Sequence, residues 1–315
     1  MDILTHYDHG IYAIDSGFGR PLLNAVHLML EDGRAAIIDS ANNDSVPRVL
    51  AVLDYLGIAP EQVDYLIATH IHLDHAGGVG QLLQRLPQAK LVVHPRGARH
   101  MTDPTRLIAS TIEVYGPRAA AKMYGEILPV DAQRLIETHH GMELALAGRK
   151  LTFLDTPGHA RHHHCIVDGR SGHIFAGDTF GLSYREWDSD GRRFIFPSTT
   201  PVQFDPPELH RSVDLLASYR PEAIYVTHYS QVTDIPRLVD DLHRLIDAHA
   251  GIALQARGSA ERHEQLKAGV AELMCREAEM QGWAIQGDAL LALLKMDIEL
   301  NAQGLGAWLD ASAAK

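Results

Sequence analysis

The chain of 315 residues contains almost no cysteine, few aromatic side chains and no long apolar run. Only Cys165 and Cys275 occur, so no disulfide framework holds the fold together and nothing requires an oxidising compartment. No apolar run reaches the length of a membrane span, and the residues after Met1 lack the basic and apolar regions of a signal peptide. We therefore expect a cytoplasmic protein that makes no membrane contact.

Basic residues are also in the minority. Lys and Arg together number 28 against 40 Asp and Glu, which gives a formal net charge of -12. A surface of this charge does not attract the phosphates of a polynucleotide, so we expect a small-molecule substrate and no nucleic-acid partner. With 46% hydrophobic residues, the chain can bury a full core, as one large domain or as two smaller ones.

The chain is instead rich in histidine, and its densest cluster lies directly after the apolar residues 65–68. His70, His72, Asp74 and His75 lie within six consecutive positions there. If a buried strand continues to His72, the two-residue period of a strand puts His70 and His72 on one face, where one cation can bind both. Asp74 and His75 then point at a second cation where the chain leaves the strand. A solvated histidine-rich loop is the weaker interpretation, because such a loop has no reason to follow a buried strand.

Four other apolar runs also end in residues that can bind a metal. Residues 35–38 precede Asp39, residues 151–154 precede Asp155 with His159 shortly after, residues 173–176 precede Gly177 and Asp178, and residues 223–227 precede His228. Ligands collect where several strands end on one side of a sheet, so residues far apart in the sequence can meet there in one site.

The chain begins with strands and ends with helices. Asp32-Gly33 is a hairpin signal between strands at 25–30 and 34–39, and further strands are expected at 142–146, 151–154, 165–167 and 173–176. Residues 102–137 form a helical insertion, with helices at 106–114 and 117–128, that is a candidate wall or lid for a pocket.

The region after His228 is predicted to be helical to its end. Helices are expected at 236–250, 261–281 and 288–300. The last is apolar over much of its circumference and must be covered, either by its own domain or by a second copy of the chain in a homodimer. We expect a catalytic domain at 1–250 and a C-terminal helical extension at 251–315.

The metal-binding residues resemble the pattern of a known family. The motif H-x-H-x-D-H at 70–75, a His after Thr156-Pro157-Gly158, then Gly177-Asp178 and a final His at a strand end are similar to the metallo-β-lactamase-fold hydrolase superfamily, especially its glyoxalase II-like and lactonase-like branches. The resemblance covers roughly residues 10–250. It implies an α+β fold, a four-layer αββα sandwich of two similar halves, followed here by the C-terminal helices.

The resemblance also implies two divalent metal ions. His70, His72 and His159 would hold one, Asp74, His75 and His228 would hold the other, and Asp178 would bridge them. Zinc is the expected metal, with iron and manganese as alternatives, because imidazole and carboxylate ligands without cysteine suit all three. Asp39 matches the first acidic position of the family, where it would support a ligand.

The sequence differs from two branches of this superfamily at positions that matter for their activities. Class B1 β-lactamases have Cys at the position of Asp178, and flavodiiron oxidoreductases have Glu at the position of His72 and a following flavin domain, so both activities are disfavoured. We expect hydrolysis of an ester-like bond, a thioester or a lactone, through a metal-bridging hydroxide that Asp74 orients as the catalytic residue. The alternatives are an iron-dependent oxidoreductase similar to persulfide dioxygenases, and a metal-binding regulatory protein that acts through its helical tail.

Two further groups of residues are conspicuous. His162, His163 and His164 follow the ligand His159, and they are expected either to support the ligands or contact substrate, or to be exposed at the surface. The aromatic residues of segment 180–196 either line the mouth of the substrate site or pack without touching substrate.

Overall fold

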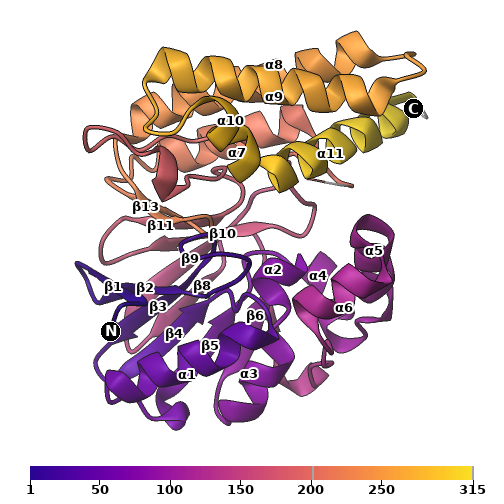
Figure 1. The fold of residues 1–315 in the computed structure, drawn as a ribbon. Coiled ribbons are helices and arrows are strands. Elements are labelled where there is room, and N and C mark those ends of the chain that lie inside the picture. Colours follow the sequence, from indigo (N-terminus) through magenta and orange to yellow (C-terminus); the bar gives the residue numbers. More distant parts are fainter. Residues whose placement is uncertain (201, 314–315) are drawn as a thin grey trace. The chain divides into compact units, whose positions relative to one another are not determined.

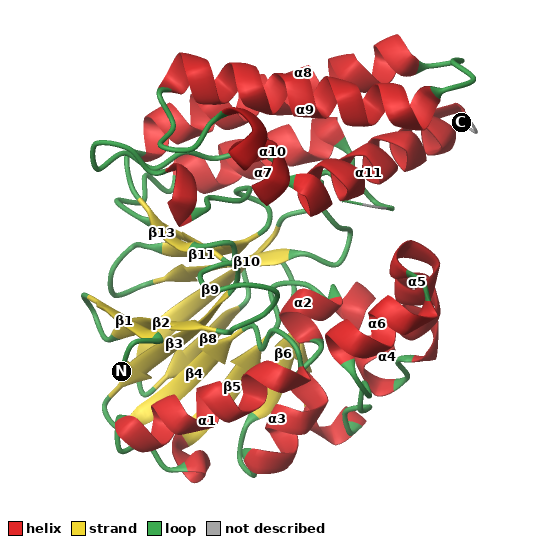
Figure 2. Ribbon diagram, in the orientation of Figure 1, coloured by secondary structure: helices red, strands yellow, loops and turns green. Residues whose placement is uncertain are grey.

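The computed structural model describes residues 1–200 and 202–313, and it is built on two sheets (Figures 1 and 2). The first sheet has the strand order β1-β2-β3-β4-β5-β6-β7. Its strands are β1 (Leu4–Tyr7), β2 (Ile11–Asp15), β3 (Ala25–Glu31), β4 (Arg34–Ile38), β5 (Val63–Ile67), β6 (Lys90–Val93) and β7 (Leu135–Glu137).

The first sheet changes from antiparallel to parallel at β4. β1 to β4 form an antiparallel meander in which Glu31 pairs with Arg34. The turn between these two residues places Asp32 at φ 42° and Gly33 at φ 75°, as a two-residue hairpin requires, so the predicted hairpin is confirmed. β4 to β7 are parallel. The carboxyl ends of β4 and β5 therefore lie at the same edge of the sheet, which is where the metal-binding residues begin.

The second sheet has the strand order β13-β12-β11-β10-β9-β8. Its strands are β8 (Glu143–Leu146), β9 (Arg149–Asp155), β10 (His164–Asp168), β11 (Ile174–Gly177), β12 (Ile224–Val226) and β13 (Ser230–Val232). β8 to β11 are antiparallel, whereas β12 joins β11 in parallel. The four strands predicted between 142 and 176 are confirmed as β8 to β11.

The two sheets share a buried apolar core. Met29 and Ile67 of the first sheet belong to one cluster with Phe153, Ile166 and Phe175 of the second. Fully burying a side chain of this size contributes roughly 1.5–3 kcal/mol, so this cluster is a main source of the fold's stability.

Helices lie on the other face of the first sheet, namely α1 (Val46–Tyr55), α2 (Leu73–Ala76), α3 (Val79–Arg85) and α4 (Pro95–Thr102). The helices α5 (Thr105–Tyr115) and α6 (Pro117–Tyr124) lie to one side, next to α2 and α4 (Figure 1). Val49, Val52 and Leu82 of these helices are fully buried in one cluster with Ile37 and Leu66 of the sheet. This part of the chain therefore consists of a helical layer and two sheet layers.

The chain divides into two compact units. The first comprises Met1–Asp155, His162–Gly177 and Ile224–Gln231, and the second comprises Thr156–Arg161, Asp178–Ala223 and the described residues from Val232 onward. The division at residue 250 stays a prediction, and α8 runs through that position.

The second unit is mainly helical, with α7 (Pro206–Ser218), α8 (Ile235–Ala256), α9 (Arg262–Gln281), α10 (Gly287–Leu293) and α11 (Lys295–Ala313). Its core is aromatic, with the rings of Trp187 and Trp283 centred 4.8 Å apart and the Tyr184 ring 4.8 Å from Trp187. The Tyr184 hydroxyl also donates a hydrogen bond to Asp297 at 2.7 Å.

The C-terminal helices cover their own apolar face. Leu290, Leu294, Ile298 and Leu305 are 8% exposed or less within this chain, although Met296 is 54% exposed. A homodimer through these helices stays a prediction. Among the described helices none combines the length and apolarity needed to cross a membrane.

Several element predictions were wrong. The single helix expected at 288–300 is two helices, α10 and α11, interrupted at Leu294. The insertion at 102–137 contains α5 and α6 but also the strand β7, and α6 ends at Tyr124 because Gly125 adopts φ 63°. Strand β1 was not predicted, because its side chains are largely exposed and carry no clear apolar alternation.

Candidate metal centre

His70 and His72 lie on a loop and not on a strand as predicted. β5 already ends at Ile67, and Thr69 donates its backbone N–H to the side chain of Asp39 at 2.8 Å instead of to a neighbouring strand. This side-chain acceptor ends the ladder of backbone hydrogen bonds. The two rings still meet, with His70 Nε2 2.9 Å from His72 Nδ1, so the loop brings together the two nitrogen ligands that the sequence pattern had paired.

Asp74, His75 and His228 form a three-residue cluster in the first unit. Each offers one ligand atom, and these atoms lie within 4.8 Å of one another. Asp74 Oδ2 is 3.5 Å from His75 Nε2 and 3.3 Å from His228 Nε2. Asp74 and His75 belong to the short helix α2, whereas His228 follows β12, so this cluster depends on the tertiary fold.

The second nitrogen of each histidine in this cluster is held in place. His75 Nδ1 donates a hydrogen bond to Asp39 Oδ2 at 2.9 Å, and His228 Nδ1 donates one to the carbonyl of Leu23 at 2.8 Å. Both rings are therefore in the tautomer whose Nε2 lone pair faces Asp74. A carboxylate or carbonyl on the far nitrogen is the usual support of a metal-binding histidine, so these residues fit a divalent cation.

Asp39 connects several parts of this centre. It is 1% exposed, and its carboxylate accepts hydrogen bonds from the hydroxyls of Thr69 and Thr227, both at 2.9 Å, besides the one from His75. This agrees with the supporting role inferred for Asp39. The two threonines were missed in the sequence, although each directly precedes a predicted ligand, His70 or His228, which is a signal that could have identified them.

His162, His163 and His164 are all buried, so the expectation of surface exposure was wrong. They are 8%, 0% and 1% exposed. The His163 ring lies 4.9 Å from that of His70 at 26°, and a Cβ on Gly177 would approach His163 Nε2 to 2.5 Å. Only glycine at 177 leaves room for this ring. His163 thus packs directly against a predicted ligand, and contact with substrate stays a prediction.

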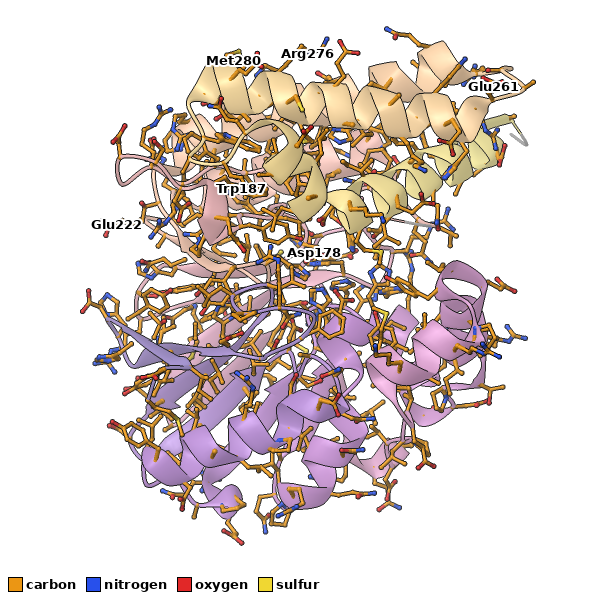
Figure 3. All side chains as sticks on the ribbon, viewed as in Figure 1. Asp178, Trp187, Glu222, Glu261, Arg276 and Met280 are labelled. Atoms are coloured by element: carbon orange, nitrogen blue, oxygen red, sulfur yellow. The ribbon has the colours of Figure 1, made fainter. Side chains whose placement is uncertain are left out.

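His159 and Asp178 belong to the second unit, in which Figure 3 labels Asp178. Both are buried, and His159 Nε2 lies 3.7 Å from Asp178 Oδ2. The His159 ring is fixed because its Nδ1 donates a hydrogen bond to the carbonyl of Ser198 at 3.2 Å. The assignment of His159 to the first metal and of Asp178 as the bridging ligand stays a prediction.

The loop that carries His159 packs tightly on α7. A Cβ on Gly158, which has φ 128°, would lie 2.4 Å from the backbone of Leu209, and the Ser212 hydroxyl donates a hydrogen bond to the carbonyl of Pro157 at 2.5 Å. Glycine is required at 158 both for this φ and for the close approach. The position of His159 thus depends on α7.

Comparison with known proteins identifies the family of this chain. A model of the metallo-beta-lactamase superfamily matches residues 19–228. The chain belongs to this superfamily. The match includes all seven predicted ligands.

Proteins with a similar sequence include a fold-family member without a named reaction and a named hydrolase. This chain is 28% identical over 199 residues, 61% of the chain and 68% of the relative, to a metallo-beta-lactamase fold-containing protein of Sulfurisphaera tokodaii. It is 32% identical over 179 residues, 56% of the chain, to a hydroxyacylglutathione hydrolase of Xanthomonas euvesicatoria pv. vesicatoria. The match spans only 51% of that hydrolase, about half of its length.

Solved structures of superfamily members confirm the predicted α+β fold with C-terminal helices. A metallo-beta-lactamase superfamily protein from Sulfolobus tokodaii matches with a TM-score of 0.66 at 23% identity, over 95% of this chain and 99% of that one. A family protein from Thermus thermophilus matches with a TM-score of 0.68 at 18% identity, over 97% and 94% of the two chains. At these identities the similarity is one of fold alone.

The helical insertion of this superfamily member contacts α2, the helix that carries the predicted ligands Asp74 and His75. Tyr124 is 3% exposed and packs in one apolar cluster with Leu73, the residue before Asp74. Asn42 also donates a hydrogen bond to the carbonyl of Met123 at 2.6 Å. The insertion is thus anchored beside α2. Its role as the wall or lid of a substrate pocket stays a prediction.

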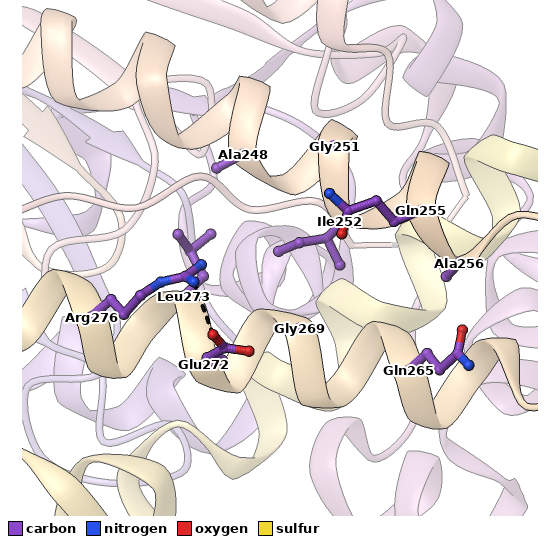
Figure 4. A pocket seen from close by; sticks show the side chains of 10 residues that line it. All are labelled: Ala248, Gly251, Ile252, Gln255, Ala256, Gln265, Gly269, Glu272, Leu273 and Arg276. Atoms are coloured by element: carbon purple, nitrogen blue, oxygen red, sulfur yellow. Dashed lines mark hydrogen bonds and ion pairs between the residues drawn. The ribbon is translucent and has the colours of Figure 1, made fainter.

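Two other features were candidates for substrate binding. Within segment 180–196, Tyr184, Trp187, Phe194 and Phe196 are 2% exposed or less and contribute to the core of the second unit, which favours packing as their role. A cavity of about 510 Å³ lies between α8 and α9, lined in part by Gly251, Gln255, Gly269 and Glu272 (Figure 4). None of the seven predicted ligands lines this cavity, so it is separate from the metal chemistry.

Proposed function

We propose that this protein is a dinuclear metal-dependent hydrolase that acts on an ester-like bond, with thioesters and lactones as the preferred substrate classes. The observation that carries the proposal is the pair of histidines, His75 and His228, whose Nε2 lone pairs are both directed at Asp74. Such a preorganised nitrogen and oxygen set suits a zinc-type cation, with iron and manganese as alternatives. Hydroxyacylglutathione is itself a thioester, so the Xanthomonas relative supports that substrate class.

When bound, two divalent cations would supply Lewis acidity at the substrate carbonyl and an acidified water. The protein's own contribution is to place the ligands and to move a proton. Asp74 is suited to that second task because its side chain is 24% exposed, whereas those of His75 and His228 are 0% and 7% exposed. Its backbone is fixed, since Asn24 Nδ2 donates a hydrogen bond to the Asp74 carbonyl at 2.7 Å. The Asp74 carboxylate is the group that would accept the proton.

The test joins metal analysis to a substrate panel. We expect the metal-loaded protein to contain two metals per chain and to release acid from S-acylglutathione thioesters or from lactones. Asp74→Asn should reduce kcat by at least about 100-fold, the range typical of a positioned acid or base. Asp64→Asn is the matched control, because it removes the same negative charge as Asp74→Asn. Asp64 forms an ion pair with Arg34 of the first sheet and contacts none of the predicted ligands.

Other outcomes would overturn the proposal. A single iron per chain with oxygen uptake on a persulfide would assign the protein to iron-dependent oxidoreductases of this fold. No turnover by the fully metal-loaded protein across the panel, together with a partner whose binding is lost when the C-terminal helices are removed, would assign it to regulation.

A further inference from the structure

A group of histidines and aspartates joins α7 to α8, in the second unit. The two helices carry the same pattern, a histidine followed four positions later by an aspartate: His210 and Asp214 on α7, and His243 and Asp247 on α8. Residues four apart lie on one helical face. The contacts between the helices are crossed, with His210 Nε2 3.0 Å from Asp247 Oδ1 and His243 Nε2 3.0 Å from Asp214 Oδ1.

The two imidazole rings face each other through their remaining nitrogens. His210 Nδ1 lies 2.6 Å from His243 Nδ1. The ring planes are within 14° of parallel and the ring centres are 4.9 Å apart. Nitrogens this close exclude face-to-face stacking of parallel rings, so the rings meet edge to edge with nitrogen opposite nitrogen.

This arrangement requires a positive charge between the rings. An ionised carboxylate only accepts hydrogen bonds, so Asp247 and Asp214 assign a proton to the Nε2 atoms of His210 and His243. Both neutral rings would then direct a lone pair at the other across 2.6 Å, which is repulsive. Either one extra proton or a cation bound by both Nδ1 atoms removes the repulsion.

The surroundings favour a divalent cation over a proton. Two carboxylates flank the pair and supply two negative charges, which matches a divalent cation. Each histidine has a carboxylate on its far nitrogen, the support that orients metal-binding histidines and raises their basicity. Each histidine side chain is 26% exposed, so water can complete the coordination. Tetrahedral metal–nitrogen bonds of about 2.0–2.1 Å put two nitrogens about 3.3–3.4 Å apart, so on binding the rings would move apart by about 0.7–0.8 Å, which their position at the surface allows.

We propose that His210 and His243 bind one divalent cation of the zinc class through their Nδ1 atoms, with Asp247 and Asp214 orienting the two rings. This site shares no residue with the seven predicted ligands, and it does not depend on the proposed hydrolase function. A cation at this site would fix α7 against α8. Leu209 and Ser212, also on α7, contact the loop that carries His159. The role of the site is therefore to brace the helix on which that loop rests.

The experiment is equilibrium dialysis of the full chain against zinc, followed by elemental analysis. At about 10 μM free zinc, enough to saturate a site of micromolar Kd, wild type should bind one more zinc per chain than the double variant His210→Gln/His243→Gln. His263→Gln is the matched control, because His263 also pairs with a carboxylate, Glu299, at 3.0 Å but has no second histidine opposite it. It should bind as much zinc as wild type. Zinc should raise the Tm of wild type, and this increase should be smaller in the double variant.

Variants of the aspartates keep the test valid if the double variant does not fold. Asp214 and Asp247 are 69% and 77% exposed, so Asp214→Asn/Asp247→Asn should fold and should weaken zinc binding at this site by about 10–100-fold. Equal zinc content in wild type and in both double variants would overturn the proposal, and the ring pair would then share a proton. Loss of zinc in His263→Gln as well would overturn it by showing unspecific surface binding.

Discussion

His75 Nδ1 and Asp39 Oδ2 are 2.9 Å apart, and both side chains are buried, at 0% and 1% exposed. Asp39 directly follows β4 and His75 lies in α2, so this hydrogen bond joins the end of β4 to the short helix that follows β5 in the chain. Because the same carboxylate also binds Thr69 and Thr227, the orientation of the ligands depends on a residue that is not itself predicted to touch a metal.

Asp39→Asn should therefore lower metal affinity without removing a ligand. The amide is neutral and has one oxygen, so it supports the His75 ring less well and cannot accept all the bonds that the carboxylate accepts. We expect the affinity for the second metal to fall by about 10–100-fold, measured by competition with a chelator. The control Asp64→Asn, which removes a surface ion pair, should leave this metal affinity unchanged. Equal affinities in the two variants would contradict the role assigned to Asp39.

Asp178→Ala should remove more metal than any other single ligand change. In the predicted centre this carboxylate would bind both cations and would offset their repulsion, so its loss would weaken both sites. His228→Ala should weaken mainly the second site and leave one metal per chain. Elemental analysis after gel filtration gives the stoichiometries, with exposed Asp240→Ala as the control for a lost acidic residue. Two metals retained by Asp178→Ala would refute the bridging assignment.

The buried His164 should make the fold sensitive to acid. Burial lowers the pKa of His164 to about 3, with the nearby His94 acting in the same direction and Asp155 opposing it. As the pH falls, His164 takes up a proton near pH 6.5 in the unfolded chain but only near pH 3 in the folded chain. The contribution of His164 to stability is therefore fully present above pH 6.5 and is lost as the pH falls toward 3. Between pH 7.5 and pH 4 the loss from this residue is about 3 kcal/mol.

His164→Gln tests this prediction, because glutamine cannot take up a proton. The free energy of unfolding from urea titration should depend less on pH in the variant than in wild type by about that amount, and the comparison cancels the contributions that both proteins share. His140→Gln, a change at an exposed position, should keep the pH dependence of wild type. An unchanged slope in His164→Gln would show that this ring is protonated in the folded protein.

Trp283→Ala should strongly destabilise the second unit. Trp283 is 3% exposed and its ring lies 4.8 Å from that of Trp187 and 5.8 Å from that of Phe194. Truncation leaves a cavity in this aromatic core, so we expect a loss of about 3–5 kcal/mol in the free energy of unfolding. Met280→Ala is the control at an exposed position three residues earlier, 65% exposed, and should cost less than about 0.5 kcal/mol. Equal unfolding curves would show that the C-terminal helices do not depend on this contact.

The sequence by itself indicated the superfamily and a metal-binding chemistry. Imidazoles and carboxylates placed after apolar runs marked the residues able to bind a metal, the family resemblance implied which seven are ligands, and the Asp32-Gly33 pair predicted its hairpin. Apart from the resemblance, these inferences rest on side-chain chemistry and on local backbone geometry. Both are properties of a few neighbouring residues.

Only the tertiary structure decided how those residues are held. The loop at His70 and His72, the tautomers of His75 and His228, and the burial of His162 to His164 all depend on partners far away in the chain, such as Asp39 for Thr69 and Leu23 for His228. The facing rings of His210 and His243 likewise arise only when α7 packs on α8. Periodicity along one segment carries no information about such partners, because each hydrogen bond forms only after the fold has brought both ends together.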